Sequence, residues 1–386
     1  MESSLWGKIS QSCVKKGLLL FLLIPLPYNT IFAIETPAIP AAHAPLMSSP
    51  PPHINWSGKR VLWLGTSIPH QGVGVDGYPE QFCQRMGCTV TNNAFSGSHI
   101  KWFEKDVDES CAQAWNTPKG LSATYRELSE KIQAALPDDG SSSYDLSCKK
   151  ATNPIQMSYE YRINSFWKQA PYDVVVIDHG HNDRTITPKD RENALGTLAP
   201  TPVEVLSITK GLTTQIKLPR DHKLQVNDDI TIRTPNIPQM DFWTGEIQQM
   251  NGDVATINLD SSHFKGHDLG HDYLVTYDKS KFFDAYNLII SDIYHMHARY
   301  GGNPPTIILM TPPTEWTGGR NDGSITDINT AIFRLAQQWH LPFFNLTTDL
   351  NIQSQNLTDY LPDKVHPITT ETRKTIADHI VAWAVQ

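Results

Sequence analysis

The chain has 386 residues and an ordinary globular composition, with 39% hydrophobic and 19% charged residues. This composition excludes a disordered or fibrous protein, and the length allows a full-sized core with room for a smaller second unit. The formal net charge of −8, with no long basic run beyond the first residues, argues against nucleic acid or an anionic membrane surface as a partner. A small or neutral ligand is the better expectation.

The first 33 residues have the pattern of a secretory signal peptide. Three lysines, the last of them Lys16, precede an apolar run from Gly17 to Leu26 that is too short to span a bilayer. We therefore predict cleavage after Ala33 and a secreted or periplasmic protein without a membrane span after cleavage. An uncleaved anchor or a buried N-terminal helix is the alternative.

Residues 34–56 are rich in Pro and Ala, which is typical of an extended linker. We expect the folded domain to begin near Ser57. Residues 60–65 (RVLWLG) are then a short apolar run suited to a buried first strand, with Ser67 just after it.

Strand and helix patterns alternate along the rest of the chain. We expect further strands at 89–95, 173–177, 306–310 and 342–345, and helices at 78–86, 121–136, 157–167, 281–300, 325–339 and 370–384. Such alternation predicts a parallel sheet covered by helices on both faces. The two parts of this domain are assigned to residues 57–201 and 279–386.

The exception is an insertion at residues 202–278, which contains only short strand patterns separated by turn signals. Strands are expected at 203–208, 214–218, 229–233, 254–259 and 273–277. We interpret the insertion as a small all-β unit, either a barrel or a sandwich. Because it follows the loop after the third strand, it should emerge at the sheet edge where ligands bind, and it could wall a substrate cleft.

Ser67, Asp363 and His366 have the residue types of a catalytic triad. A serine hydroxyl is a weak nucleophile unless a base takes its proton, and the base needs an acid to orient it. The three-residue spacing of Asp363 and His366 on a turn lets the carboxylate reach Nδ1 while Nε2 faces a serine. Viewed separately, Ser67 could be a helix N-cap, and the Asp–His pair could be a surface salt bridge.

Two segments could donate hydrogen bonds to a developing oxyanion. Residues 92–97 follow the second strand, and Gly97 would let the backbone approach a ligand closely. Residues 180–182 follow the third strand and could project the Asn182 carboxamide over the same edge. An ordinary loop glycine and an Asx-turn are the alternative interpretations.

Taken in this order, Ser67, Gly97, Asn182 and His366 resemble the four sequence blocks of the SGNH hydrolases, the GDSL-type esterase and lipase superfamily. The resemblance implies a flavodoxin-like three-layer α/β/α sandwich, with Ser67 as nucleophile, His366 as base and Asp363 as its orienter. It also implies an oxyanion hole made by the Ser67 and Gly97 amides and the Asn182 side chain, and no cofactor. It covers residues 60–183 and 281–386, but not the insertion.

One position departs from the family pattern. Thr66 stands where the first motif usually has an acidic residue, which is not a triad member, so the departure concerns loop geometry and not the reaction.

Other residues with reactive side chains carry weaker signals. His179, His181 and Asp183 flank Asn182 and could line the cleft or bond only to neighbouring loops. His263, His267 and His271 recur at four-residue spacing, but the intervening glycines argue against a helical metal site, and we predict none.

Four cysteines would remain after signal cleavage, namely Cys83, Cys88, Cys111 and Cys148. In an oxidising compartment they predict one or two disulfides, with three connectivities open. A zinc site is weakly supported, because no second close pair of cysteines follows the first.

The expected activity is hydrolysis of O-acetyl or other short acyl esters on a carbohydrate, with an acylated small molecule or glycan as the partner. A lipid esterase or lysophospholipase, a polysaccharide O-acetyltransferase, and a catalytically silent glycan-binding protein are the alternatives, since fold alone does not choose among them.

Overall fold

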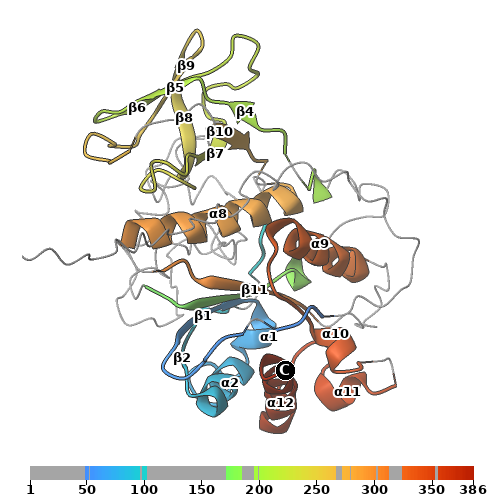
Figure 1. Cartoon of the computed structure of the whole chain (residues 1–386). Coiled ribbons are helices and arrows are strands. Elements are labelled where there is room, and N and C mark those ends of the chain that lie inside the picture. The colour runs from blue at the N-terminus through green and yellow to red at the C-terminus, as the bar shows by residue number, and fades with distance from the viewer. Residues whose placement is uncertain are drawn as a thin grey trace, which may run out of the picture. The chain divides into compact units, whose positions relative to one another are not determined.

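The computed structural model describes most of the chain from residue 48 onward (Figure 1). The described residues are 48–51, 53–95, 98–101, 171–184, 195–198, 200–266, 272–278, 280–300, 303–312, 324–352 and 355–386. All of them belong to one compact unit. The expected signal peptide and the helices expected at 121–136 and 157–167 lie outside the described residues.

Five parallel strands form the central sheet. They are β1 (Arg60–Gly65), β2 (Thr89–Asn92), β3 (Val174–Asp178), β11 (Thr306–Thr311) and β12 (Phe343–Asn345). Their spatial order is β12-β11-β3-β1-β2, which in sequence order is the 2-1-3-4-5 arrangement of flavodoxin-like folds. The predicted fold class is therefore confirmed, and the edge at the carboxyl ends of β1 and β3 is where such folds bind ligands.

Helices cover both faces of this sheet. They are α1 (Ser67–His70), α2 (Tyr78–Met86), α8 (Phe282–Tyr300), α9 (Ser324–Trp339), α10 (Leu346–Asp349), α11 (Leu357–Tyr360) and α12 (Thr370–Ala384), with a 3₁₀ turn, η3, at His181–Arg184. Figure 1 shows α8 and α9 on one side and α2 and α12 on the other.

Alternate residues along each strand feed the two cores, as the pleat of a strand requires. Leu62 and Leu64 of β1 pack with α8 and α9, whereas Val61 and Trp63 pack with α2 and α12. Both faces are thus apolar, which explains why β3 is a continuous β-branched run with every residue buried.

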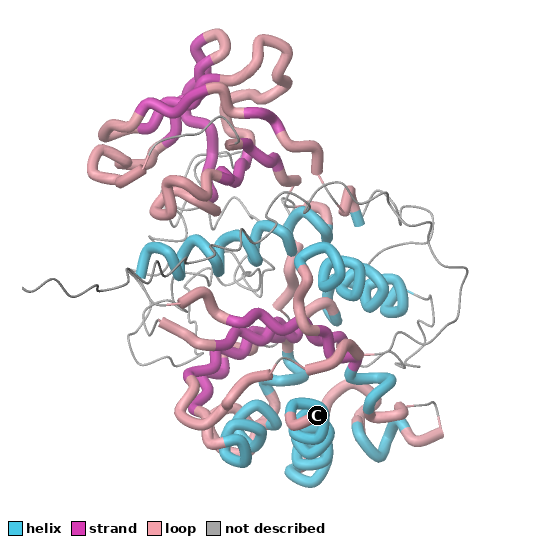
Figure 2. The backbone as a smooth tube through the Cα atoms, viewed as in Figure 1, coloured by secondary structure: helices cyan, strands magenta, loops and turns pink. Residues whose placement is uncertain are grey.

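The insertion forms a separate antiparallel sheet (Figure 2). Its strands are β4 (Val203–Glu204), β5 (Ser207–Thr209), β6 (Thr214–Lys217), β7 (Asp229–Arg233), β8 (Thr244–Asn251), β9 (Val254–Ile257) and β10 (Tyr273–Thr276). The pairing order is β4-β10-β7-β8-β9-β6-β5.

One segment, 203–209, pairs with both ends of that order. β4 pairs with β10 and β5 with β6. Between them, the Val205 amide donates to the Asp272 carbonyl at 2.9 Å and the Leu206 amide to the Lys217 carbonyl at 2.8 Å. The sheet is therefore closed into a small barrel, which decides between the barrel and the sandwich left open by the sequence. We call it the β-barrel insertion.

The longest strand of the insertion, β8, has no counterpart among the strands expected from the sequence. Its residues, TGEIQQMN, are mostly polar, and a register shift between Ile247 and Gln249 interrupts the pleat. A bulge of this kind breaks the two-residue alternation on which strand prediction depends.

Phe242 joins the β-barrel insertion to the helices of the sheet domain. Its ring lies 5.1 Å from that of Tyr294 on α8 and 6.3 Å from that of Trp339 on α9. The Arg233 guanidinium carbon lies over the Phe242 ring, 3.7 Å from the ring centre. Phe242 has a φ of +61°, which is uncommon for a residue with a side chain. The insertion is thus packed against the domain and not merely tethered to it.

The end of the expected linker is packed as well. The Ser49 amide donates to the Phe343 carbonyl of β12 at 2.9 Å, and the Trp383 indole donates to the Ser49 carbonyl at 2.9 Å. Trp56 is only 3% exposed. The folded domain therefore begins before Ser57. As an edge strand, β12 has backbone groups without a strand partner on one side, and Ser49 forms a hydrogen bond with one of them.

Cys83 and Cys88 form a disulfide between the end of α2 and the start of β2. Cys111 and Cys148 lie outside the described residues. Within the part of the chain that the structure describes, no helix has the length and hydropathy needed to cross a bilayer.

Candidate active site

The turn from β1 into α1 places Ser67 at the start of a helix. Thr66, 1% exposed, is the N-cap: its Oγ1 accepts a hydrogen bond from the Ile68 amide at 3.3 Å. The N-cap interpretation of Ser67 is therefore wrong by one residue. Because Thr66 caps the helix, the Ser67 hydroxyl remains available for another partner.

Gly65 makes this tight turn possible. A Cβ at this position would lie 2.2 Å from Cγ of Pro69 and 3.0 Å from the backbone oxygen of Asp178. Any side chain would therefore collide with Pro69 of α1 and crowd the backbone of β3. Thr66, the residue that departs from the SGNH pattern, lies in this turn, whose shape depends on the adjacent Gly65. The Thr66 hydroxyl caps α1.

Ser67, His366 and Asp363 lie in one hydrogen-bonded chain, although 299 positions separate the serine from the histidine in sequence. The His366 Nε2 atom lies 2.8 Å from the Ser67 Oγ, and Nδ1 lies 2.8 Å from the Asp363 Oδ2. This is the connectivity that a serine nucleophile, its base and an orienting acid require.

The second carboxylate oxygen of Asp363 organises the loop. Its Oδ1 accepts hydrogen bonds from the Val365 amide at 2.8 Å and the His366 amide at 2.6 Å. Partial burial raises the pKa of Asp363, but the bonds from the His366 side chain and from these two amides outweigh it and hold the pKa below its usual range. Asp363 is therefore the ionised partner of the pair.

The Asn182 side chain is positioned by Ser98, the residue after Gly97. Its Nδ2 donates to the Ser98 carbonyl at 2.7 Å. The Phe95 amide and the Ser98 hydroxyl both donate to the Gly65 carbonyl, at 3.0 and 2.7 Å. Gly97 itself lies outside the described residues. Phe95 and Ser98 are thus both bonded to Gly65, which lies two residues before Ser67. The second N–H of the Asn182 carboxamide remains for a ligand.

His179, His181 and Asp183 do not lie on an open surface, contrary to the expectation that they could line the cleft. They are 1%, 4% and 0% exposed. The carboxylate of Asp183 accepts from the Ile100 amide at 3.0 Å and from the Lys101 amide at 2.9 Å. Asp183 therefore holds the segment that carries Ser98, because a buried carboxylate needs such donors.

Asp178 is a residue near the site that the sequence analysis missed. It pairs with Gly65 in the β1–β3 register and is 2% exposed. Its Oδ2 accepts from the Tyr78 hydroxyl and from the Trp63 indole. Burial raises the pKa of Asp178 to about 6, against the opposite effect of these two bonds. The only sequence signal was an acid ending an otherwise apolar strand.

The structure does not test the histidine metal ladder, because only one of its three histidines is described. His263 is exposed, and its Nδ1 lies 2.9 Å from the Ser262 hydroxyl, while His267 and His271 lie outside the described residues. Among the described residues no group of three or more His, Cys, Asp or Glu side chains could hold a metal ion.

No protein-family model matches the chain, and no curated protein is significantly similar to it. Among solved structures, an aryl esterase from M. smegmatis is 12% identical, covering 84% of this chain and 97% of its own, with a TM-score of 0.39. An acetylxylan esterase from Geobacillus stearothermophilus is 13% identical, covering 86% and 95%, with a TM-score of 0.36. A GDSL-like lipase from Bacteroides thetaiotaomicron is 12% identical, covering 83% and 85%, with a TM-score of 0.30.

Proposed function

We propose that the protein is a carboxylic ester hydrolase of the SGNH type that uses Ser67, His366 and Asp363. The observation that carries this proposal is the pair of 2.8 Å contacts that connects the Asp363 carboxylate through the His366 ring to the Ser67 hydroxyl. Either contact alone is common on protein surfaces, whereas the two together at the ligand-binding edge of a parallel sheet form the arrangement that nucleophilic catalysis by a serine requires.

In the proposed reaction, the Ser67 Oγ attacks the ester carbonyl while His366 Nε2 takes the serine proton. The Asp363 carboxylate stabilises the imidazolium that forms. Collapse of the tetrahedral intermediate breaks the bond to the alcohol, which leaves with the proton from His366. Water then attacks the acyl-serine, His366 removes its proton, and release of the acid restores Ser67.

The oxyanion of each tetrahedral intermediate needs donors that are already in place. As the first residue of α1, Ser67 carries an amide that has no partner within its own helix. The Asn182 carboxamide, oriented by Ser98, is the second donor in our proposal, and the Gly97 amide is the third.

We further propose a short acyl group on a carbohydrate as the substrate, acting outside the cytoplasm. The site is open: the side chains of Asp363 and His366 are 41% and 25% exposed, which suits a bulky polar alcohol more than an enclosed acyl chain. The packed β-barrel insertion would supply a rigid surface for a glycan. The secretory pattern at the N-terminus agrees with an extracellular or periplasmic polymer.

The first test is hydrolysis of p-nitrophenyl acetate, butyrate and palmitate by the chain from Ile34, beside Ser67→Ala. We expect turnover of acetate that the substitution abolishes. Equal turnover by both proteins would contradict the proposed nucleophile. A preference for palmitate would favour a lipid esterase, and faster acyl transfer to an added sugar than to water would favour an acyltransferase. No turnover in either protein would favour a glycan-binding protein.

A further inference from the structure

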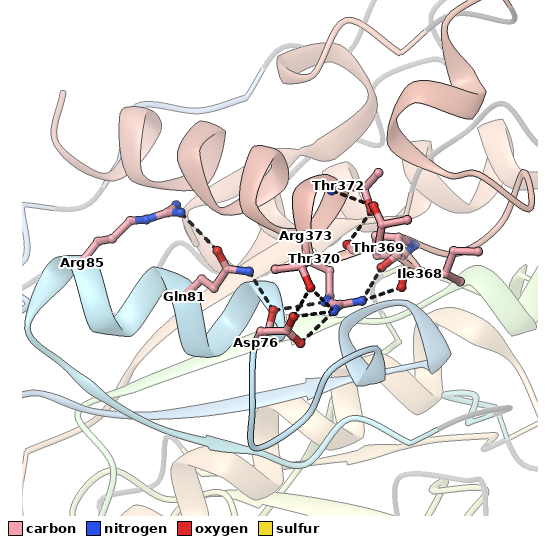
Figure 3. Close-up of polar contacts among 9 residues, drawn as sticks. Asp76, Gln81, Arg85, Ile368, Thr369, Thr370, Thr372 and Arg373 are labelled. Atoms are coloured by element: carbon pink, nitrogen blue, oxygen red, sulfur yellow. Dashed lines mark hydrogen bonds and ion pairs between the residues drawn. The ribbon is translucent and has the colours of Figure 1, made fainter.

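Arg373, near the start of α12, is an almost buried cation with a complete set of partners (Figure 3). It is 7% exposed. A buried guanidinium is costly unless its N–H groups are paired. Here Nη2 donates to both carboxylate oxygens of Asp76, at 2.7 and 2.6 Å, and Nε donates to the Asp76 carbonyl at 3.1 Å. Nη1 donates to the carbonyls of Pro367 and Ile368, at 3.1 and 2.9 Å.

These partners belong to the turn that follows the Ser67 helix and to the loop that carries Asp363 and His366. Asp76 ends the turn that leads from α1, which begins at Ser67, into α2. Pro367 directly follows His366. The Arg373 side chain therefore bonds both to the turn that follows the Ser67 helix and to the residues that follow His366.

The other backbone bonds that the structure gives the His366 loop are local to it: the Lys364 amide donates to the Leu361 carbonyl at 2.7 Å, and the Ile368 amide donates to the His366 carbonyl at 2.9 Å. Asp363 and His366 bond to each other, so the pair can shift as a unit without breaking its internal contact. Lys364 between them has a φ of +67°, and the Asp363 side chain is 41% exposed. The contact between His366 Nε2 and Ser67 Oγ thus depends on a restraint from outside the pair.

Gly72 lies next to the ion pair between Asp76 and Arg373, where there is no room for a side chain. It has a φ of +77°, and a Cβ there would lie 2.5 Å from Oδ1 of Asp76 and 2.8 Å from Nε of Arg373. Gly74, in the same turn, has a φ of +74°, but no described atom lies within 4 Å of the corresponding Cβ position. The two glycines share the same backbone requirement, and only Gly72 must leave room for the ion pair.

We propose that Arg373 is a positioning residue that, through Asp76 and the Pro367 carbonyl, sets the register between Ser67 and His366. This inference rests on the proposed esterase function. Neither Arg373 nor Asp76 touches the reacting atoms, so their loss should slow the chemical step and leave ground-state binding nearly unchanged. A misplacement of about 1 Å between reacting groups costs on the order of 100-fold in rate.

The test compares Arg373→Lys, Asp76→Asn and Gly72→Ala with the wild type and with Gly74→Ala as the matched control. Each protein is assayed for p-nitrophenyl acetate hydrolysis, at a temperature where its circular dichroism is native. We expect the first three to lower kcat by about 10- to 100-fold, with KM changed by less than about threefold. The midpoint of the acid limb of the pH–rate profile should not move, because the Asp363–His366 contact is retained.

Gly74→Ala should keep kcat within about threefold of the wild type, since it adds the same backbone strain without a clash. The proposal is overturned if folded Arg373→Lys and Asp76→Asn both keep wild-type kcat. It is also overturned if Gly74→Ala is as slow as Gly72→Ala, or if activity falls only in proportion to the folded fraction.

A second measurement separates this proposal from the ester-hydrolase assignment. The rate of Ser67 labelling by a fluorophosphonate reports the activated serine without any ester substrate. A wild type that turns over no ester but labels at Ser67 would count against the proposed substrate, and slower labelling of Arg373→Lys would still support the positioning role. A labelling rate equal to that of the wild type would overturn it.

Discussion

At the scale of single residues, the candidate site depends on how each polar side chain shares its atoms. Asp363 uses Oδ2 for the His366 ring and Oδ1 for the amides of Val365 and His366. Thr66 caps α1 and leaves the Ser67 hydroxyl to His366. In both cases a neighbouring backbone group decides which atom remains for chemistry.

Asp363→Asn should separate loop structure from catalysis. The asparagine oxygen can still accept from the two amides, but its NH₂ group cannot accept from the His366 Nδ1–H, so the ring loses the favoured tautomer. We expect kcat/KM for p-nitrophenyl acetate to fall by about 10³- to 10⁴-fold. Unchanged thermal stability would show that the loop persists. A loss below about tenfold would contradict the role of Asp363 as the orienting acid.

Asp178→Asn should change how the free energy of unfolding depends on pH, because it removes a buried carboxyl group near the site. The pKa of Asp178 is about 6 in the folded state and 3.8 in the reference state, so the folded protein binds the extra proton between these values. The free energy of unfolding therefore decreases as pH rises through that window, by about 3 kcal/mol. Relative to the wild type, the variant should gain that amount between pH 4 and pH 7, a range set by the same linkage.

Urea unfolding at several pH values measures this difference. Asp173→Asn is the control of opposite sign. Although burial raises the pKa of Asp173, the bonds from the Arg60 amide and the Lys59 side chain hold it below its usual range. Its stabilising effect is present at neutral pH and is lost as pH falls through the folded pKa. A pH-independent difference between Asp178→Asn and the wild type would contradict the prediction.

At the scale of elements, short connections are held by bonds that act close to the site. The Cys83–Cys88 disulfide joins α2 to β2, and the Cys88 amide also donates to the Cys83 carbonyl at 3.0 Å. β2 in turn leads to Asn92, whose side chain donates to the Pro69 carbonyl of α1 at 3.1 Å. The disulfide therefore restrains the layer on which the Ser67 turn rests.

The double substitution Cys83→Ser, Cys88→Ser should lower the free energy of unfolding by about 2 kcal/mol, the value for a loop this short. The backbone bond between the two residues remains, so α2 should persist and ester hydrolysis should be retained. Urea unfolding of the variant and of the reduced wild type measures the effect. Identical midpoints for the oxidised wild type and the variant would contradict it.

At the scale of the whole molecule, the β-barrel insertion enters and leaves the sheet domain at one place. Its first and last strands pair, with Val203 opposite Leu274. Phe242 then packs the barrel on α8 and α9. The insertion can therefore be removed as one continuous segment, although Phe242 packs it against the sheet domain.

Replacing residues 202–277 by a short Gly/Ser linker should therefore leave the triad intact. We expect hydrolysis of p-nitrophenyl acetate to persist and hydrolysis of an acetylated polysaccharide to fall strongly, because the surface that we propose for glycan recognition is removed. Phe242→Ala, which keeps the barrel but loosens its contact, should show a smaller loss on the polymer. Equal activity of the deletion variant and the wild type on the polymer would contradict the recognition role.

The sequence by itself determined the fold class and which residues could perform the chemistry. Continuous apolar strands such as Val174–Asp178, and helices such as α2 and α12, carry local patterns that do not depend on distant contacts. The block order of Ser67, Asn182 and His366 likewise needed no coordinates. The polar strand β8 was not predicted from the sequence, because its bulge removes the alternation of apolar and polar residues.

Only the tertiary structure decided how these residues meet. That His366 reaches Ser67 across 299 positions, that Asp183 anchors a loop instead of lining a cleft, and that 203–209 closes a barrel all depend on long-range pairing. The same holds for the bonds from Arg373 to Asp76. A local pattern encodes backbone preference and burial, whereas a contact between distant residues depends on how whole elements pack, which no single window of sequence contains.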